Sequence, residues 1–295
     1  MDEPATRPRT PLPPRYGPRQ RLPAEIVERA RAYPTGPQIP VPVRDAATVV
    51  LLRDGADGVE ACTLRRAATM AFAANMHVFP GGTVDPADNR EDIPWIGPPV
   101  EEIAHALGAG PALTRGLVCA AVRETFEESG VLLAGASPAS LADTSAPSWR
   151  DDRRALEEHR LGLAELLRAR SLALRADMLR PWARWVTPVV EPRRYDTRFF
   201  VARMPPGQVA EADGTEAKQL DWMRPVTALE REEEGAVGLL PPTAFTLAEL
   251  AEYDSVDAVM AAAAIRDLAP VMPKILITDG EAHLLLPHDQ AYEQA

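Results

Sequence analysis

The segment between Leu113 and Leu133 restricts the fold more than any other part of this chain. Up to Glu128, apolar residues recur at helical spacing, which predicts a helix with one buried face. Gly130 follows the last turn and suits a left-handed C-cap. The apolar residues Val131 to Leu133 then begin a predicted strand or apolar ledge. A helix with one buried face has to pack against another layer of the fold.

In the rest of the chain, segments with the pattern of a strand alternate with segments that have the spacing of a helix. Ala46 to Arg53 and Val59 to Arg66, separated by a Gly-containing turn, predict a β-hairpin. Further strands are predicted at 76–79, 184–190, 197–203 and 219–223, with a closing hairpin at 275–277 and 283–286. Helices are predicted at 23–32, 100–107, 150–180, 226–234, 245–253 and 256–267. This order predicts an α/β fold in which a mixed sheet lies between helices.

The composition excludes several classes of protein. The formal net charge of −11 opposes binding to a nucleic-acid backbone, and an acidic enzyme with an anionic substrate needs metal ions or local arginines. Cys62 and Cys119 are too few for a disulfide framework. No apolar run approaches the roughly 20 residues of a membrane span, and no apolar signal core is present. We therefore expect a cytoplasmic protein that binds neither nucleic acid nor membrane.

Three glutamates at the end of the predicted helix carry the strongest chemical signal. Glu124, Glu127 and Glu128 stand at i, i+3 and i+4, so they share one helix face. A divalent cation would relieve their repulsion, and Mg²⁺ prefers such oxygen ligands together with water and substrate phosphates. Arg123 can hold one of them by a charge-assisted hydrogen bond. The alternative is a solvated, charged helix face without chemistry, which these four residues alone do not exclude.

The surrounding residues resemble the Nudix hydrolase family. Its box reads Gly, five residues, an acidic residue, seven residues, then R-E-U-x-E-E-x-G-U, in which U is aliphatic. Arg123 to Val131 supplies the second half, and Gly82 with Asp88 supplies the first. Trp222 to Val226 is similar to the family's late strand and helix start. The resemblance implies a Nudix-type α/β/α sandwich with a mixed sheet and extra helices.

The box departs from the family pattern in two ways. Arg123 follows Gly82 by 41 positions, against 14 in an uninterrupted box, so an insertion splits the box and leaves the placement of Asp88 open. Thr125 stands where an aliphatic residue is usual, and we expect its methyl group to pack inward. The same split, and the run from Arg123 to Leu133, resemble the peroxisomal-type coenzyme A diphosphatases.

The resemblance implies roles for individual residues. Glu124, Glu127 and Glu128 would bind Mg²⁺ or Mn²⁺, and the expected catalytic residues are Glu124, Arg123 and Glu127. Gly81 and Gly82 would lie against the substrate. Glu216 would supply a late ligand or base, although a solvated loop glutamate is the plainer interpretation. From the residues themselves, Arg193, Arg194 and Arg198 are candidates to hold substrate phosphates, with surface ion pairing as the alternative.

The sequence therefore predicts metal-dependent hydrolysis of a diphosphate linkage in a nucleoside diphosphate derivative, with coenzyme A or acyl-CoA as the first candidate. ADP-ribose, nucleotide sugars and dinucleotides are alternatives, as are a ligand-sensing regulator without turnover and an isomerase of isoprenoid diphosphates. We expect a Pro/Arg-rich arm at 1–22 and one domain at 23–295, with insertions at 86–112 and 136–181 and an extension from 243. The helical stretch 150–180 caps the active site or forms a homodimer contact.

Overall fold

The computed structural model describes residues 22, 24–33, 39–66, 76–90, 92–212, 217–266, 268–278 and 281–294. The α-helices are α1 (Ala24–Ala32), α2 (Val100–Leu107), α3 (Pro111–Ser129), α4 (Ser148–Glu157), α5 (Leu163–Ala169), α6 (Pro225–Glu233), α7 (Pro241–Leu250) and α8 (Val256–Ala263). Short 3₁₀ helices span Pro86–Asn89, Ala176–Met178 and Tyr292–Gln294. The predicted arm lies, apart from Leu22, outside the described residues, and the predicted domain boundaries stay a prediction.

The strands form one large sheet and two small ones. The strands are β1 (Val43–Gly55), β2 (Gly58–Arg66), β3 (Met76–Val78), β4 (Gly81–Thr83), β5 (Trp95–Ile96), β6 (Ala134–Gly135), β7 (Ala173–Arg175), β8 (Arg180–Val186), β9 (Arg194–Arg203), β10 (Ala217–Met223), β11 (Gly238–Leu239), β12 (Lys274–Thr278) and β13 (Glu281–Leu285). The large sheet has the order β11-β3-β2-β1-β9-β8, with β10 paired to β2 and β4 paired to β1. Because β1 runs parallel to β9 and antiparallel to β2, this sheet is mixed.

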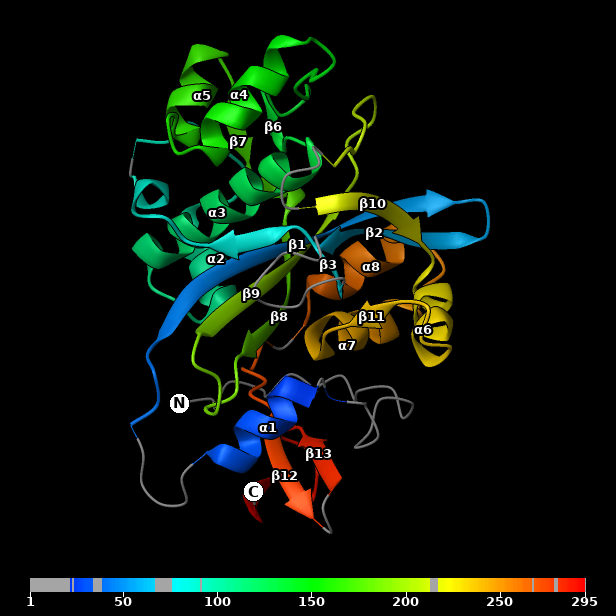
Figure 1. Cartoon of the computed structure of the whole chain (residues 1–295). Coiled ribbons are helices and arrows are strands. Elements are labelled where there is room, and N and C mark those ends of the chain that lie inside the picture. The colour runs from blue at the N-terminus through cyan, green and yellow to red at the C-terminus, as the bar shows by residue number, and fades with distance from the viewer. Residues whose placement is uncertain are drawn as a thin grey trace, which may run out of the picture.

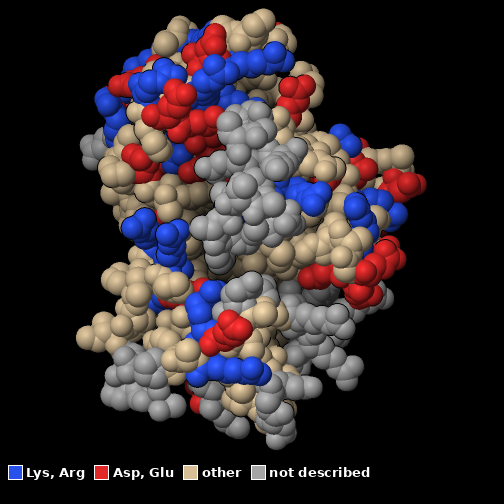
Figure 2. Space-filling model, viewed as in Figure 1, with Lys and Arg blue, Asp and Glu red and all other residues tan. Residues whose placement is uncertain are grey.

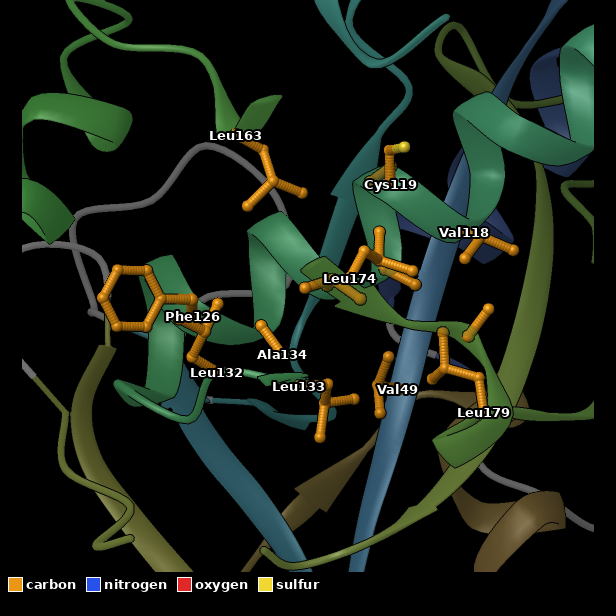
Figure 3. Packing of buried hydrophobic residues seen from close by; sticks show 14 of the residues in the cluster. Val49, Val118, Cys119, Phe126, Leu132, Leu133, Ala134, Leu163, Leu174 and Leu179 are labelled. Carbon is orange, nitrogen blue, oxygen red and sulfur yellow. The ribbon is translucent and has the colours of Figure 1, made fainter. Parts of the chain in front are cut away.

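The central strand β1 separates two hydrophobic cores, because successive side chains of a strand point to opposite faces. Val49 and Leu51 lie in the first core with apolar residues of α3, and Val50 and Leu52 lie in the second with residues of α7 and α8. Figure 3 shows Val49 near the buried side chains of α3 in the first core. The helices α2 and α3 thus cover one face of the sheet, and α7 and α8 cover the other (Figure 1). The predicted α/β fold, with a mixed sheet between helices, is confirmed.

Most predicted elements are present, but the segment 150–180 differs from its prediction. It contains two short helices, α4 and α5, followed by β7 and the beginning of β8. Ser171 adopts a positive φ of 55°, which ends the helical stretch, and β7 then pairs with both β5 and β6. This pairing overrides the helical pattern. The predicted strand 184–190 likewise begins earlier, at Arg180, and ends at Val186.

The insertion in the box has structure of its own. Between β4 and α3 the chain forms the 3₁₀ helix Pro86–Asn89, the strand β5 and the helix α2. In Figure 1, α2 lies beside α3, whereas α4 and α5 lie at the end of the molecule over which blue and red side chains gather in Figure 2. None of the described helices combines the length and the apolar character that a membrane span needs.

Candidate active site

The helix α3 presents the three glutamates because its other face is fixed in the core. It begins with Pro111 in its first turn and ends at Gly130, whose φ is +72° and whose N–H donates to the carbonyl of Phe126. Thr125 is fully buried, and its hydroxyl donates to the carbonyl of Ala121 at 2.6 Å. A Thr is therefore tolerated at the aliphatic position because its hydroxyl is satisfied within the helix, and the expected burial of this residue is confirmed.

Arg123 lies at the centre of the acidic cluster and is only 6% exposed. Its Nη1 donates to Glu124 Oε1 at 2.8 Å and lies 3.4 Å from Glu127 Oε1. Its Nη2 donates to the carbonyl of Thr83 at 2.9 Å. Burial alone would lower the pKa of Arg123, but the neighbouring carboxylates hold it above its usual range. This guanidinium therefore stays charged and fixes the direction of two glutamates.

Asp88, whose placement the sequence left open, completes this cluster. It is 4% exposed, and its Oδ2 accepts from Arg123 Nη2 at 2.9 Å while its Oδ1 accepts from Nε at 3.1 Å. A second hydrogen bond, from the backbone N–H of Asp85 at 2.8 Å, holds the same carboxylate. The two halves of the box therefore lie in contact despite the insertion between them, and Asp88 holds Arg123 in position.

The Gly81–Gly82 turn lies directly against the glutamates. The strand β4 pairs with β1, so that Gly81 lies opposite Thr48 and Gly82 opposite Ala47. The N–H of Gly81 donates to Glu128 Oε2 at 2.8 Å. A Cβ atom at Gly82 would overlap with the carboxylate of Glu124. The glycines are thus required by close approach, and each faces one glutamate.

The donor set of this cluster suits a divalent cation. Three carboxylates, of Asp88, Glu124 and Glu127, contact one guanidinium, and Glu128 adds a fourth at the Gly81 N–H, so the cluster carries an excess of negative charge when all are ionised. Burial, reinforced by the Glu124 carboxylate, raises the pKa of Glu127 to about 7 against the opposing effect of Arg123. A hard cation that prefers oxygen ligands would compensate this excess.

The carboxylates do not form a closed cage. Among the described residues, no three carboxylate, imidazole or thiol groups are already gathered so that together they could hold a metal ion. This arrangement still fits Mg²⁺, which keeps several waters and is usually bound through one or two carboxylates and the phosphates of a substrate.

The glutamates open into a cavity of about 1110 Å³. Gly81, Gly82, Arg123, Glu124, Glu127 and Glu128 all line it, so the structure brings together every residue of the predicted box site. Glu216, the predicted late ligand or base, lies outside the described residues.

Arg194 and Arg198 do not line this cavity, which corrects their assignment as substrate-binding residues. Arg194 is buried and donates to the carbonyls of Val41 at 2.9 Å and Thr187 at 3.1 Å. Arg198 is buried in an ion pair with Asp196 at 2.6 Å. The strand β9 turns both side chains toward the protein itself, where their charges are already used.

Arg193, which the sequence did suggest, lines the cavity together with three arginines that it did not. In the part of the chain that the structure describes, the side chains of Arg66, Arg150, Arg154 and Arg193 line the cavity and make no hydrogen bond or ion pair. Arginines elsewhere, such as Arg170 and Arg175, are paired with aspartates. An anionic ligand would supply the missing partners.

The helix α4 carries part of this basic lining and is attached to the box helix. Arg153 donates from Nε to the carbonyl of Glu127 at 2.6 Å and from Nη1 to the carbonyl of Glu211 at 3.0 Å. Phe126 and Trp149 pack edge to face, with ring centroids 5.9 Å apart. Arg150, Arg153 and Arg154 stand at i, i+3 and i+4, a spacing that could have identified this face in the sequence.

The remaining conspicuous residues are structural. His77 is buried and hydrogen-bonded through Nδ1 to the hydroxyl of Thr63 at 3.2 Å. Cys119 and Trp182 are fully buried in the two cores, and Trp222 packs against the first core under the guanidinium of Arg53.

The chain is similar to several known proteins. The family model of the NUDT19 Nudix domain matches residues 105–250. The human acyl-coenzyme A diphosphatase NUDT19 is 30% identical over 281 residues, which cover 80% of this chain and 73% of the human protein. A putative nudix hydrolase 7 of Caenorhabditis elegans is 27% identical over 238 residues, 81% of this chain and 70% of that protein. The crystal structure of a NUDIX hydrolase from Alicyclobacillus acidocaldarius is 30% identical and has a TM-score of 0.63, covering 78% of this chain and 99% of the other.

The fold, the split box and these relatives define an enzyme of the hydrolase class. Nudix hydrolases generally need divalent metal ions. The chain belongs to the Nudix hydrolase family, in the group that the NUDT19 Nudix domain describes.

Proposed function

We propose that this protein hydrolyses the diphosphate linkage of coenzyme A or an acyl-CoA with Mg²⁺ or Mn²⁺, which Glu124, Glu127 and Glu128 would bind. The observation that carries this proposal is the shared cavity, which is lined both by the carboxylates of α3 and by arginines without protein partners. Its volume of about 1110 Å³ lies at the upper end of the range for small-molecule sites and suits a coenzyme. The human relative is an acyl-coenzyme A diphosphatase.

The chain's own residues would bind the substrate, hold it in place and accept a proton. A bound cation neutralises phosphate oxygens and acidifies a water molecule. Glu124, whose carboxylate is fixed by Arg123 at 2.8 Å, accepts the proton of the attacking water. The oxygen of that water bonds to one phosphorus, and the bridging P–O bond breaks. The Gly81–Gly82 turn lets the substrate approach without a side chain in between, and Arg66 and Arg193 of the lining face its anionic groups.

The test is a substrate panel with the purified full chain in Mg²⁺ and in Mn²⁺, with products identified by mass. We expect coenzyme A to give 4′-phosphopantetheine and adenosine 3′,5′-bisphosphate, and acyl-CoA to give the acylated phosphopantetheine. Release of inorganic phosphate would count against the reaction. So would acyl-CoA that remains unchanged. EDTA is expected to abolish turnover.

The same panel separates the alternatives. A kcat/KM for ADP-ribose, a dinucleotide or a nucleotide sugar above that for every CoA derivative would overturn the substrate class. Ligand binding by calorimetry without any turnover in either metal would instead indicate a regulator.

A pair of glycine substitutions tests the geometry of the turn. In Gly82→Ala the new methyl group would meet the carboxylate of Glu124, the end of a flexible side chain, so the protein can fold while this group moves. We expect kcat to fall about a hundredfold, since a displacement near 1 Å costs that much, with little change in Tm.

Gly81→Ala is the contrasting variant, because its methyl group would meet the backbone of Ala47 and Thr48, which cannot move aside. We expect a lowered Tm in that variant. Gly110→Ala, where nothing lies within 4 Å of an added Cβ, is the control. Full activity in Gly82→Ala would contradict the position of the Glu124 carboxylate against Gly82 and its role in catalysis.

A further inference from the structure

The cavity has a second end whose chemistry differs from that of the box. There its lining is apolar and comes from both ends of the chain and from the second core. The side chains of this apolar end are Leu22, Ile26, Trp185, Pro273, Ile275 and Leu284. Phosphate and ribose are polar and gain nothing from such a wall, whereas an alkyl chain is stabilised by it. The apolar end therefore faces a different part of the ligand from the one that the glutamates and arginines face.

Specific contacts hold the elements of the apolar end in place. On α1, Arg29 makes two hydrogen bonds to Glu191 Oε1, at 3.1 and 3.2 Å, and Glu191 itself is buried. This pair ties the helix to the loop between β8 and β9 and neutralises the carboxylate beside the cavity. On α1, Ile26 lines the cavity, and Leu22, just before the helix, packs against the second core.

The hairpin β12–β13 closes the other side of the apolar end. It is attached through Val271, whose N–H donates to the carbonyl of Arg184 at 2.8 Å and whose carbonyl accepts from Val186 at 2.9 Å. Ile275 packs against the second core, and Leu284 is buried in it. Figure 1 shows α1, β12 and β13 together, away from α4 and α5. None of these three elements lies within residues 105–250, which match the family model.

We propose that the apolar end binds the acyl chain of a coenzyme A thioester, so that Ile26 and Ile275 set the preference of the enzyme for chain length. This inference rests on the proposed function. An acyl-CoA is charged at its diphosphate and apolar at the far end of its pantetheine arm, and the cavity shows the same two kinds of lining. Each methylene moved from water to this wall is expected to raise affinity by up to about fourfold.

The test compares free coenzyme A with acetyl-, butyryl-, octanoyl- and decanoyl-CoA, each below its micelle concentration. For the wild type we expect kcat/KM for octanoyl-CoA to exceed that for acetyl-CoA by at least about tenfold. Ile26→Gln and Ile275→Gln are expected to reduce this ratio about threefold or more, with kcat/KM for free coenzyme A within twofold of wild type. Both residues are half-buried, which favours folding of the variants.

A binding measurement without turnover makes the same comparison. By calorimetry in EDTA, octanoyl-CoA is expected to bind the two variants less tightly than wild type, while free coenzyme A binds all three alike. Ile277→Gln is the matched control, because Ile277 lies on the same strand, is 37% exposed and does not line the cavity. Ile26→Trp, which narrows this end, is expected to shift the preference toward shorter chains.

The outcomes separate this inference from the proposed function. If the wild type hydrolyses free coenzyme A but shows the same kcat/KM at every chain length, the proposed function stands and the acyl site is wrong. If both Gln variants retain the wild-type ratio and affinities, the acyl chain binds elsewhere. If no CoA derivative is hydrolysed, the proposed function itself fails.

Discussion

Replacing Glu124 with Gln is expected to lower kcat for a CoA substrate at least about a thousandfold, a loss near 4 kcal/mol of transition-state stabilisation. The substitution keeps the shape of the side chain but removes both the negative charge toward a metal ion and the group that accepts the proton of water. Arg123 can still donate to the amide oxygen, because its Nη1 lies 2.8 Å from Oε1. Folding is therefore expected to be retained.

Glu127→Gln and Glu128→Gln are expected to give losses of similar size through the metal alone. We would measure kcat with Mg²⁺ and Mn²⁺, metal affinity by calorimetry, and Tm for each variant. Glu230→Gln is the control, since Glu230 is an exposed glutamate on α6 away from the cavity. Wild-type turnover and metal affinity in Glu127→Gln or Glu128→Gln would remove that residue from the metal site.

The sequence predicts the glutamate face of the site, because that face depends only on residues close together in the chain. The glutamates share a face because α3 is a regular helix with a Pro at its beginning and a Gly after its end. Both signals can be read within a few residues. The same holds for the β1–β2 hairpin, where the turn residues Asp54 to Gly58 separate two apolar runs.

The part that the sequence does not predict depends on contacts between distant segments. Asp88 lies 35 residues before Arg123, yet they form one buried ion pair. No local pattern says that the intervening chain returns to the same point. Conversely, Arg198 is a candidate in the sequence to bind phosphate but is paired with Asp196 on its own strand. An unpaired arginine can only be recognised once the neighbours of every arginine are known, as for Arg150.

The apolar end of the cavity also depends on a contact between segments far apart in the sequence. The closing hairpin and the first helix are both predicted from their own patterns, but the contact between α1 and β12 joins the two ends of the described chain. Hydrophobic periodicity shows that each element has a face to bury. It does not say that the two faces are directed at one cavity. That depends on the contact of α1 with the loop between β8 and β9, and on the hydrogen bonds of Val271 with β8.

Arg123→Met is expected to lower the free energy of unfolding by about 3–5 kcal/mol, the usual cost of breaking a buried ion pair from one side. The guanidinium donates to Asp88, Glu124 and the carbonyl of Thr83. Its removal leaves the Asp88 carboxylate, whose side chain is 2% exposed, without its compensating charge. Arg123→Lys is expected to be nearly as harmful, because a single ammonium cannot make these bonds in their forked geometry.

A double-mutant cycle with Asp88 identifies the cause of that loss. If the cost in Arg123→Met comes from uncompensated carboxylates, adding Asp88→Asn removes one of them and returns part of the stability. Urea unfolding at pH 7 of the wild type, both single variants and the double variant gives the coupling energy, which we expect to exceed about 1 kcal/mol for groups in direct contact. Strict additivity would mean that the two residues act independently, so that Asp88 does not position Arg123. Turnover is expected to remain low in every variant that lacks Arg123, because Glu124 loses the donor that directs its carboxylate toward the substrate.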